Sequence, residues 1–374
     1  MTPPRGKAVG ILAFAGAAGL LSCIAGAMVD LRAALAAWMT ASLILTGLPL
    51  GAMTLLMIHG LTGGRWGEAM LPPLRASVAT LPLALAFLLP ILLRPDLVFP
   101  WAAADTAALP EVVRAKLAYL DVPFFLVRFA ACAAVWLALA FFVLQWTDPA
   151  ARRTYTRGFA VGLILHAAAV TVFSTDWMLS LDPEFTSTIY AMLEASAQAV
   201  GAGALALSVL ASTRAVEVIA GGEGDAVPGE DVANMLLGFM LTFAYLAFMQ
   251  WIVVWAGDLP NDIGWYLRRV AGGWRILLWL VLLLQFALPF AAFLTRGVKR
   301  SRRGLAWLAA LVLAGHVLET AWRIRPALAE PRLPLTWLEL AAPLAAGCLW
   351  TTMFVAALKQ RPRILFRRER KAHG

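Results

Sequence analysis

The chain has 374 residues, of which 61% are hydrophobic and 14% charged, and its mean hydropathy is +0.77. A soluble domain has about half apolar and about a quarter charged residues, so this composition excludes a soluble enzyme and indicates that lipid is the solvent. The net charge of +9 does not point to nucleic acid, because the basic residues cluster at the ends of apolar runs, as they do in membrane proteins.

Ten apolar runs, followed from the N-terminus to the C-terminus, are long enough to cross a hydrocarbon layer of about 30 Å as helices. We therefore expect an all-α integral membrane protein, with about ten transmembrane helices in a single polytopic domain over residues 1–374. The predicted spans are Val9–Met28, Ala34–Ile58, Ser77–Leu93, Phe124–Trp146, Phe159–Trp177, Ile189–Ala211, Val232–Trp255, Trp274–Thr295, Gly304–Trp322 and Leu338–Leu358. The first run also has features of a secretory signal peptide, but its length favours retention as a span.

The distribution of Lys and Arg predicts the orientation of these spans. If the N-terminus is cytoplasmic, about twenty basic residues lie in inner segments and about ten in outer ones. An even number of spans then places both termini in the cytoplasm and predicts a multi-pass protein of the cell inner (cytoplasmic) membrane. The Gly- and acid-rich stretch Gly221–Asp231 indicates a flexible hinge between two halves of the chain.

Polar side chains inside spans are the candidates for function, because lipid tolerates them only where they pair or line a path for ions or protons. Those predicted to lie toward the outer face are Arg128, Asp176, Glu194, Gln250, His316 and Glu319. Those predicted to lie nearer the midplane are His166, Tyr245, Thr242 and Gln285, while His59 ends the second span.

His316 and Glu319 are three residues apart, so they share one side of a helix, where a carboxylate can orient or protonate an imidazole. We expect the outer set to line one polar cavity that opens to the outer side. The alternative is that each residue makes an interhelical hydrogen bond or extends to the interface. The midplane groups, His166 among them, either complete a proton relay or are structural.

No motif indicates a cofactor bound by this chain. The sequence has no Cys-x-x-Cys-His, no cysteine cluster, no phosphate-binding loop and no His-Glu-x-x-His. His59, His166 and His316 lie at three different depths, which argues against a pair of haem ligands. The three cysteines are isolated in apolar runs. Any electron chemistry must therefore use a diffusible substrate or the cofactor of a partner.

Five stretches of the sequence, taken together and in their order along the chain, form a pattern that no single stretch would define. They are His59–Gly67; Phe99–Ala102 with Lys116–Phe125 and Arg128; Asp176–Pro183 with Ser187–Ile189; Tyr245–Trp251 with Asp258–Asp262, Trp265, Tyr266, Arg268 and Gly272–Trp274; and His316–Trp322 with Pro326. Together they resemble a membrane subunit of alternative complex III, the quinone-binding subunit 2 of this quinol:cytochrome c oxidoreductase, within the NrfD and polysulfide-reductase superfamily of membrane subunits.

The resemblance implies two four-helix bundles, formed by spans two to five (about residues 34–180) and six to nine (about residues 189–322), flanked by spans one and ten. It also implies iron–sulfur and multihaem cytochrome c subunits and a sister NrfD-like membrane subunit as partners, with quinol as a possible substrate. The chain departs from the family pattern at Glu319, where members carry Asp, and at Phe185, where Trp or Tyr is common.

These observations leave three functions open. The leading hypothesis is a membrane subunit of a respiratory electron-transfer complex that binds quinol, conducts its protons, or does both, while partner cofactors carry the electrons. A ten-span secondary transporter is the second, although the polar groups collect near one face and not at the midplane. A purely structural or assembly subunit is the third. In every case we expect the chain to contact membrane lipid and no nucleic acid.

Overall fold

The computed structural model describes residues 5–103, 109–147, 152–212, 228–328 and 336–359. Over these ranges, ten helical segments are long and apolar enough to cross a membrane, and no strand occurs. This confirms the predicted all-α integral membrane fold. The helices are α1 (Arg5–Val29), α2 (Leu31–Thr62), α3 (Arg65–Val78), α4 (Leu81–Ala86), α5 (Leu89–Leu93), α6 (Glu111–Arg114), α7 (Val122–Trp146), α8 (Thr156–Trp177), α9 (Tyr190–Ser212), α11 (Pro228–Ala256), α12 (Pro260–Val270), α13 (Trp274–Val281), α14 (Leu288–Leu294), α15 (Arg296–Lys299), α16 (Arg302–Leu328) and α17 (Leu338–Lys359).

The third span differs most from its prediction, because it is longer and is divided into α3, α4 and α5. It covers Arg65–Leu93, whereas the apolar run predicts Ser77–Leu93. Pro82 and Pro90 each lie in the first turn of a new short helix, where a missing backbone N–H leaves no hydrogen bond unmade. The predicted hinge Gly221–Asp231 lies mostly outside the described residues, since α11 begins at Pro228.

Two of the helices begin after an aspartate that acts as the N-cap residue. The Asp30 side chain accepts a hydrogen bond from the Ala33 amide at 2.9 Å and begins α2 one residue after α1 ends. Asp121 does the same for α7, accepting from the Phe124 amide at 3.2 Å. A side-chain oxygen at this position satisfies an amide that the first helical turn leaves unpaired.

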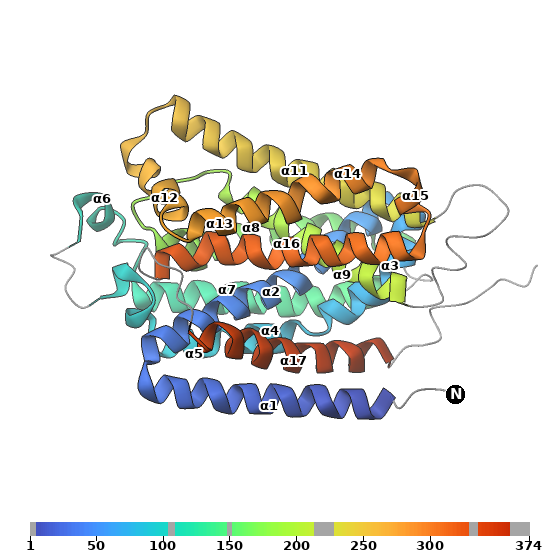
Figure 1. Cartoon of the computed structure of the whole chain (residues 1–374), viewed down its shortest axis with the longest axis horizontal. Helices are drawn as coiled ribbons and strands as arrows, with labels where there is room; N and C mark the ends of the chain where they lie inside the picture. The colour runs from blue at the N-terminus through green and yellow to red at the C-terminus, as the bar shows by residue number, and fades with distance from the viewer. Residues whose placement is uncertain (1–4, 104–108, 148–151, 213–227, 329–335, 360–374) are drawn as a thin grey trace, which may run out of the picture.

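The spanning helices lie side by side along the long axis of the molecule (Figure 1). The start of α1, the end of α17 and the short helix α15 lie at one end of the bundle, which we call the terminal end. Helices α6 and α12 lie at the opposite end, which we call the far end. The positive-inside rule predicts that the terminal end lies on the cytoplasmic side.

Helix α2 is the centre of the bundle, and 89% of its most apolar window is buried. It contacts α3, α7 and α8 in the first half of the chain, while in the second half α16 contacts α9, α13 and α14, and α11 contacts α9 and α14. The halves share a long seam between α2 and α9. A Cβ on Gly51 of α2 would lie 1.9 Å from the Gln198 carbonyl oxygen of α9, so only glycine permits this approach.

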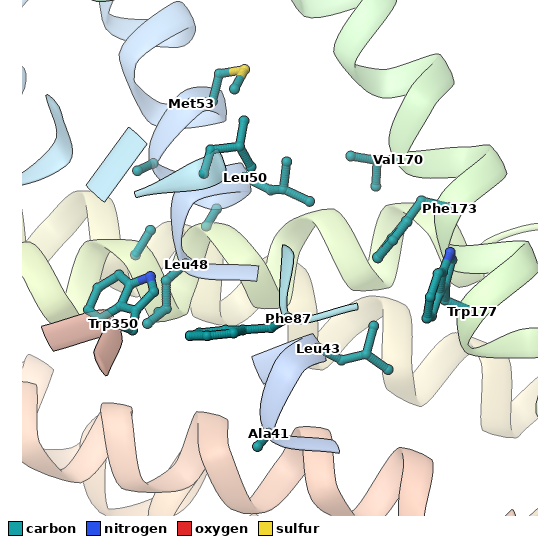
Figure 2. Close-up of a cluster of buried hydrophobic side chains, with 14 of the residues drawn as sticks. Ala41, Leu43, Leu48, Leu50, Met53, Phe87, Val170, Phe173, Trp177 and Trp350 are labelled. Atoms are coloured by element: carbon teal, nitrogen blue, oxygen red, sulfur yellow. The ribbon is translucent and has the colours of Figure 1, made fainter. Parts of the chain in front are cut away.

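The apolar core follows this arrangement. Figure 2 shows Leu43, Leu50 and Met53 of α2, with Phe173 and Trp177 of α8 on one side. Trp350 of α17 lies on the other side. Large apolar side chains fill the space between the helices in the first half of the chain. The buried polar groups described next lie between particular pairs of helices.

Candidate functional site

One buried cluster joins α9 and α16 through three charged side chains. The Arg323 guanidinium contacts a Glu194 carboxylate oxygen at 2.6 Å and also forms an ion pair with Glu319, one helical turn away on α16. The side chains are 2%, 5% and 3% exposed for Arg323, Glu194 and Glu319, respectively. Two carboxylates face one guanidinium, so the cluster carries one negative charge if both are ionised. Because a net charge is costly at such depth, this cluster is a candidate proton acceptor.

Polar groups continue from this cluster toward the middle of the membrane. The Gln198 amide nitrogen donates to the Glu194 carboxylate at 2.8 Å, one turn further along α9. His316 lies on α16 opposite Gly201, where a Cβ would be 2.6 Å from the imidazole ring. Arg323 and His316 are seven residues apart, which is about 10 Å along a helix. We call Glu194, Gln198, His316, Glu319 and Arg323 the α9–α16 column.

His316 differs from the other members of the column because its ring is unpartnered. It is 2% exposed, and neither ring nitrogen has a hydrogen-bond partner among the described residues. The Glu319 carboxylate is directed to Arg323 and does not orient His316, in contrast to the spacing-based expectation. A buried imidazole with two unused nitrogens can accept a proton on one side and release it on the other, given a mobile partner such as water.

A second unpartnered group packs against Gly315, the residue before His316. Gln285 is in η6 (Leu282–Ala287), a π-helical turn between α13 and α14, and neither of its amide atoms has a partner within the part of the chain that the structure describes. Gly315 of α16 packs directly against it, since a Cβ there would lie 2.6 Å from Gln285 Oε1. Single π-helical turns occur frequently at functional sites.

At the far end, the column connects to a second ion-pair group. The Arg269 guanidinium donates to the Arg323 backbone oxygen and lies 2.9 Å from an Asp182 carboxylate oxygen, while Arg268 contacts the other oxygen at 2.6 Å. Burial lowers the pKa of Arg269 from its ordinary value, and the charge of Asp182 opposes this shift. The Arg269 guanidinium also lies 3.6 Å from the centre of the Trp265 ring.

A surface pocket of about 240 Å³ opens beside Asp182 at the far end. Pro100 and Pro110 line one part of its wall, and Pro183, Glu184 and Arg268 line another. The polar groups therefore extend from a surface pocket, through Asp182 and Arg269, to the α9–α16 column.

Asp176 belongs to a different site. Its carboxylate lies 2.8 Å from Arg128, joining α8 to α7, and Arg128 also donates to the Tyr119 backbone oxygen at 2.9 Å. The rings of Tyr119 and Phe124 cover the guanidinium at 3.8 and 4.3 Å. Burial and the charge of Asp176 raise the pKa of Tyr119. The single outer cavity expected from sequence is therefore two separate sites, because Asp176 points to α7 and not to α9 or α16.

The hydrogen bonds of His166 fix its protonation state. The Trp136 indole N–H donates to His166 Nδ1 at 3.1 Å, and His166 Nε2 lies 2.9 Å from the Thr54 hydroxyl. Because an indole nitrogen can only donate, Nδ1 carries the lone pair, Nε2 carries the proton, and the ring is neutral. Both nitrogens are used, so His166 fits the structural alternative better than the relay.

The remaining candidates also lie apart from the column. Gln250 is buried and accepts from the Ser187 hydroxyl at 2.8 Å. Tyr245 is 60% exposed, on the surface of α11 that faces away from the bundle. His59 packs edge to face against Trp66, with ring centres 5.4 Å apart. Over the described ranges, no group of three His, Cys, Asp or Glu side chains is close enough to hold a metal ion.

The sequence pattern does not single out Arg323, the residue at the centre of the column. The apolar run predicts a ninth span that ends at Trp322, which puts Arg323 in the outer loop, whereas α16 continues to Leu328. The signal that could have found it is its spacing of four residues from Glu319, which is typical of an ion pair along a helix.

No protein-family model matches this chain, and no curated protein matches it in sequence. The resemblance to a membrane subunit of alternative complex III therefore stays a prediction.

Proposed function

We propose that the chain is a membrane subunit of a quinol-oxidising electron-transfer complex and that the α9–α16 column handles the protons. In this proposal, partner iron–sulfur and haem c subunits carry the electrons. The observation that carries it is the Glu194–Arg323–Glu319 cluster, in which two buried carboxylates share one guanidinium inside the membrane. The sequence motifs that resemble the membrane subunit of alternative complex III support the same assignment.

The chemistry of quinol oxidation requires such groups. Oxidation of one quinol releases two protons, and each needs a base within hydrogen-bond reach or one water away. Glu194 and Glu319 supply two carboxylates, and the Arg323 guanidinium supplies one opposite charge in a medium that disfavours net charge. A proton on the second carboxylate would make the cluster neutral. In this proposal the cluster gains and loses one proton in each turnover.

The position of the column supports release toward the far end. It extends from His316 near the middle of α16 to Arg323 near the far end, where Arg269 and Asp182 continue it to the surface pocket. On the terminal side of His316, the buried residues of α16 are apolar: Leu305, Leu308, Ala309 and Val312. With the terminal end on the cytoplasmic side, protons would leave on the periplasmic side.

The test removes the acid groups without changing their shape. Glu194→Gln, Glu319→Gln and Arg323→Met are introduced together in the native host, so that no guanidinium stays buried without a carboxylate, and quinol-dependent cytochrome c reduction and proton release are measured on the assembled complex. We expect turnover to fall by about 10²-fold, the lower range for loss of a general base. Asp176→Asn combined with Arg128→Met is the matched control, because it neutralises the other buried pair, and we expect it to retain most of the activity.

Other outcomes would identify another function. Unchanged turnover and unchanged proton release in the triple variant, with loss of the complex only when the chain is deleted, would overturn the proton assignment and favour an assembly subunit. Substrate-dependent uptake by the purified chain in vesicles would favour a secondary transporter. Copurification without iron–sulfur or haem c proteins would contradict the wider proposal.

A further inference from the structure

Helix α11 carries a face that is unusual for contact with lipid. Tyr245, Phe248, Trp251 and Trp255 are all exposed and follow one side of the helix. The rings of Trp251 and Trp255 stack at 5.7 Å with an interplanar angle of 8°, and Phe248 lies 5.8 Å from Trp251. We call these four residues the α11 aromatic face. Figure 1 places α11 along one edge of the bundle.

Tyr245 is the residue of this face whose position is not explained by contact with lipid. It lies eleven residues before the end of α11 at Ala256 and seventeen after its start at Pro228, or about 16 and 26 Å along the helix. Its hydroxyl is therefore close to the middle of the hydrocarbon, beyond the reach of either interface. Trp255 needs no such explanation, because tryptophan near a span end is an ordinary interfacial anchor.

The Tyr245 hydroxyl has no hydrogen-bond partner among the residues that the structure describes. Of the five tyrosines, only Tyr155 is also exposed, and it lies at the start of a span, stacked on Trp146. A hydroxyl in hydrocarbon without a partner costs several kcal/mol on alkane transfer scales. An acceptor from another molecule at this depth would remove that cost.

We propose that the α11 aromatic face is an interface with a transmembrane helix of a second, different membrane protein. The partner helix presents small residues, which let its backbone approach the aromatic rings, and an acceptor that the Tyr245 hydroxyl reaches: a backbone carbonyl or a Ser, Thr or Asn side chain. A second copy of this chain fits less well, because a twofold contact would place large rings against large rings. This inference does not depend on the proposed function.

Photocrosslinking in native membranes tests the interface. The photoreactive residue p-benzoylphenylalanine replaces Tyr245 in the full chain, and the matched control replaces Ile164, which is 70% exposed near the middle of α8. We expect one discrete protein adduct from position 245 and none from position 164. Peptide mapping should place the adduct in a transmembrane segment that contains small residues and an acceptor at mid-depth. Lipid or quinone adducts alone, or an adduct with a second copy of this chain, would overturn the proposal.

A second variant tests the hydroxyl itself. Tyr245→Phe keeps the ring and removes the donor, so the chain should fold and insert normally while the crosslinked partner copurifies about threefold less well, as expected for loss of one interhelical hydrogen bond in a membrane. Tyr155→Phe is the control and should leave copurification unchanged. Equal recovery of the partner with both variants would contradict the assigned role of Tyr245.

Discussion

The two buried arginine sites differ in the number of carboxylates that each guanidinium faces. Arg128 faces Asp176 alone, so this site is neutral, and one Asp176 carboxylate oxygen and one Arg128 nitrogen have no hydrogen-bond partner among the described residues. Arg323 faces both Glu194 and Glu319, so this guanidinium has one carboxylate in excess, and the nearest compensating cations are Arg268 and Arg269, which share Asp182 at the far end. Burial is similar in the two sites, so the proposed proton exchange rests on the number of carboxylates that each guanidinium faces. Two substitutions test this distinction, and two more test the surroundings of His316 and His166.

The largest effect should follow Arg323→Met. The substitution leaves two carboxylates buried without a cation, and we expect it to lower the free energy of unfolding by about 5 kcal/mol, the upper range for breaking a buried pair. Thermal unfolding of the detergent-solubilised chain, monitored by size-exclusion chromatography, measures this. Adding both Glu194→Gln and Glu319→Gln should recover most of the loss. Full recovery with only one of them would contradict the two-to-one arrangement.

Arg128→Met should have a smaller effect and a simpler rescue. This site lies near the start of α7, toward the far end, so we expect a loss of about 3 kcal/mol, the lower range for a broken buried pair. Asp176→Asn alone should recover most of it, because only one charge is then unpaired. The same melting assay compares the single and double variants. A need for a further neutral substitution would show that Asp176 is not the sole counter-ion.

Gly201→Ala should disturb His316 without changing any charge. The added Cβ would lie 2.6 Å from the imidazole, and overpacking of this kind costs about 1 to 3 kcal/mol. Gly238→Ala on α11 is the matched control, since a Cβ there meets nothing within 4 Å. A double-mutant cycle with His316→Ala should remove most of the penalty at position 201. Equal penalties in both backgrounds would mean that the ring is not the obstacle.

The smallest effect is expected for Thr54→Val. It removes the hydroxyl that pairs with His166 Nε2, and one side-chain hydrogen bond within a membrane bundle contributes about 0.6 kcal/mol on average. We expect a slightly lower melting temperature and no change in proton release. A large loss of proton release would instead make His166 a relay residue.

The sequence predicts the depth of the polar residues better than their partners. The spacing of three residues assigns His316 and Glu319 to one helix side, and both do lie in the α9–α16 column. The predicted direct pairing is wrong, because Arg323 takes the Glu319 carboxylate. The span boundary explains why the arginine is missed: a run of apolar residues ends at the first charges, whereas α16 continues past them.

For Asp176 and His166 as well, the sequence predicts the depth of the side chain but not its partner. Asp176 and Glu194 lie toward the outer ends of consecutive spans, which predicts that they are close, yet the Asp176 carboxylate turns to Arg128. The depth of His166 makes it a relay candidate, yet Trp136 and Thr54 occupy both of its nitrogens. In each case the deciding partner comes from a helix that is distant in sequence.

Local composition is enough to specify a helical chain that crosses a membrane about ten times, because each span must satisfy its own backbone hydrogen bonds and be long enough to cross. The cation that each carboxylate meets, and the polar atoms that stay unpartnered, depend instead on the packed bundle. Position along a helix gives depth directly, but the direction in which a side chain points depends on how its helix is rotated and packed, as the glycine contacts at Gly51 and Gly201 illustrate.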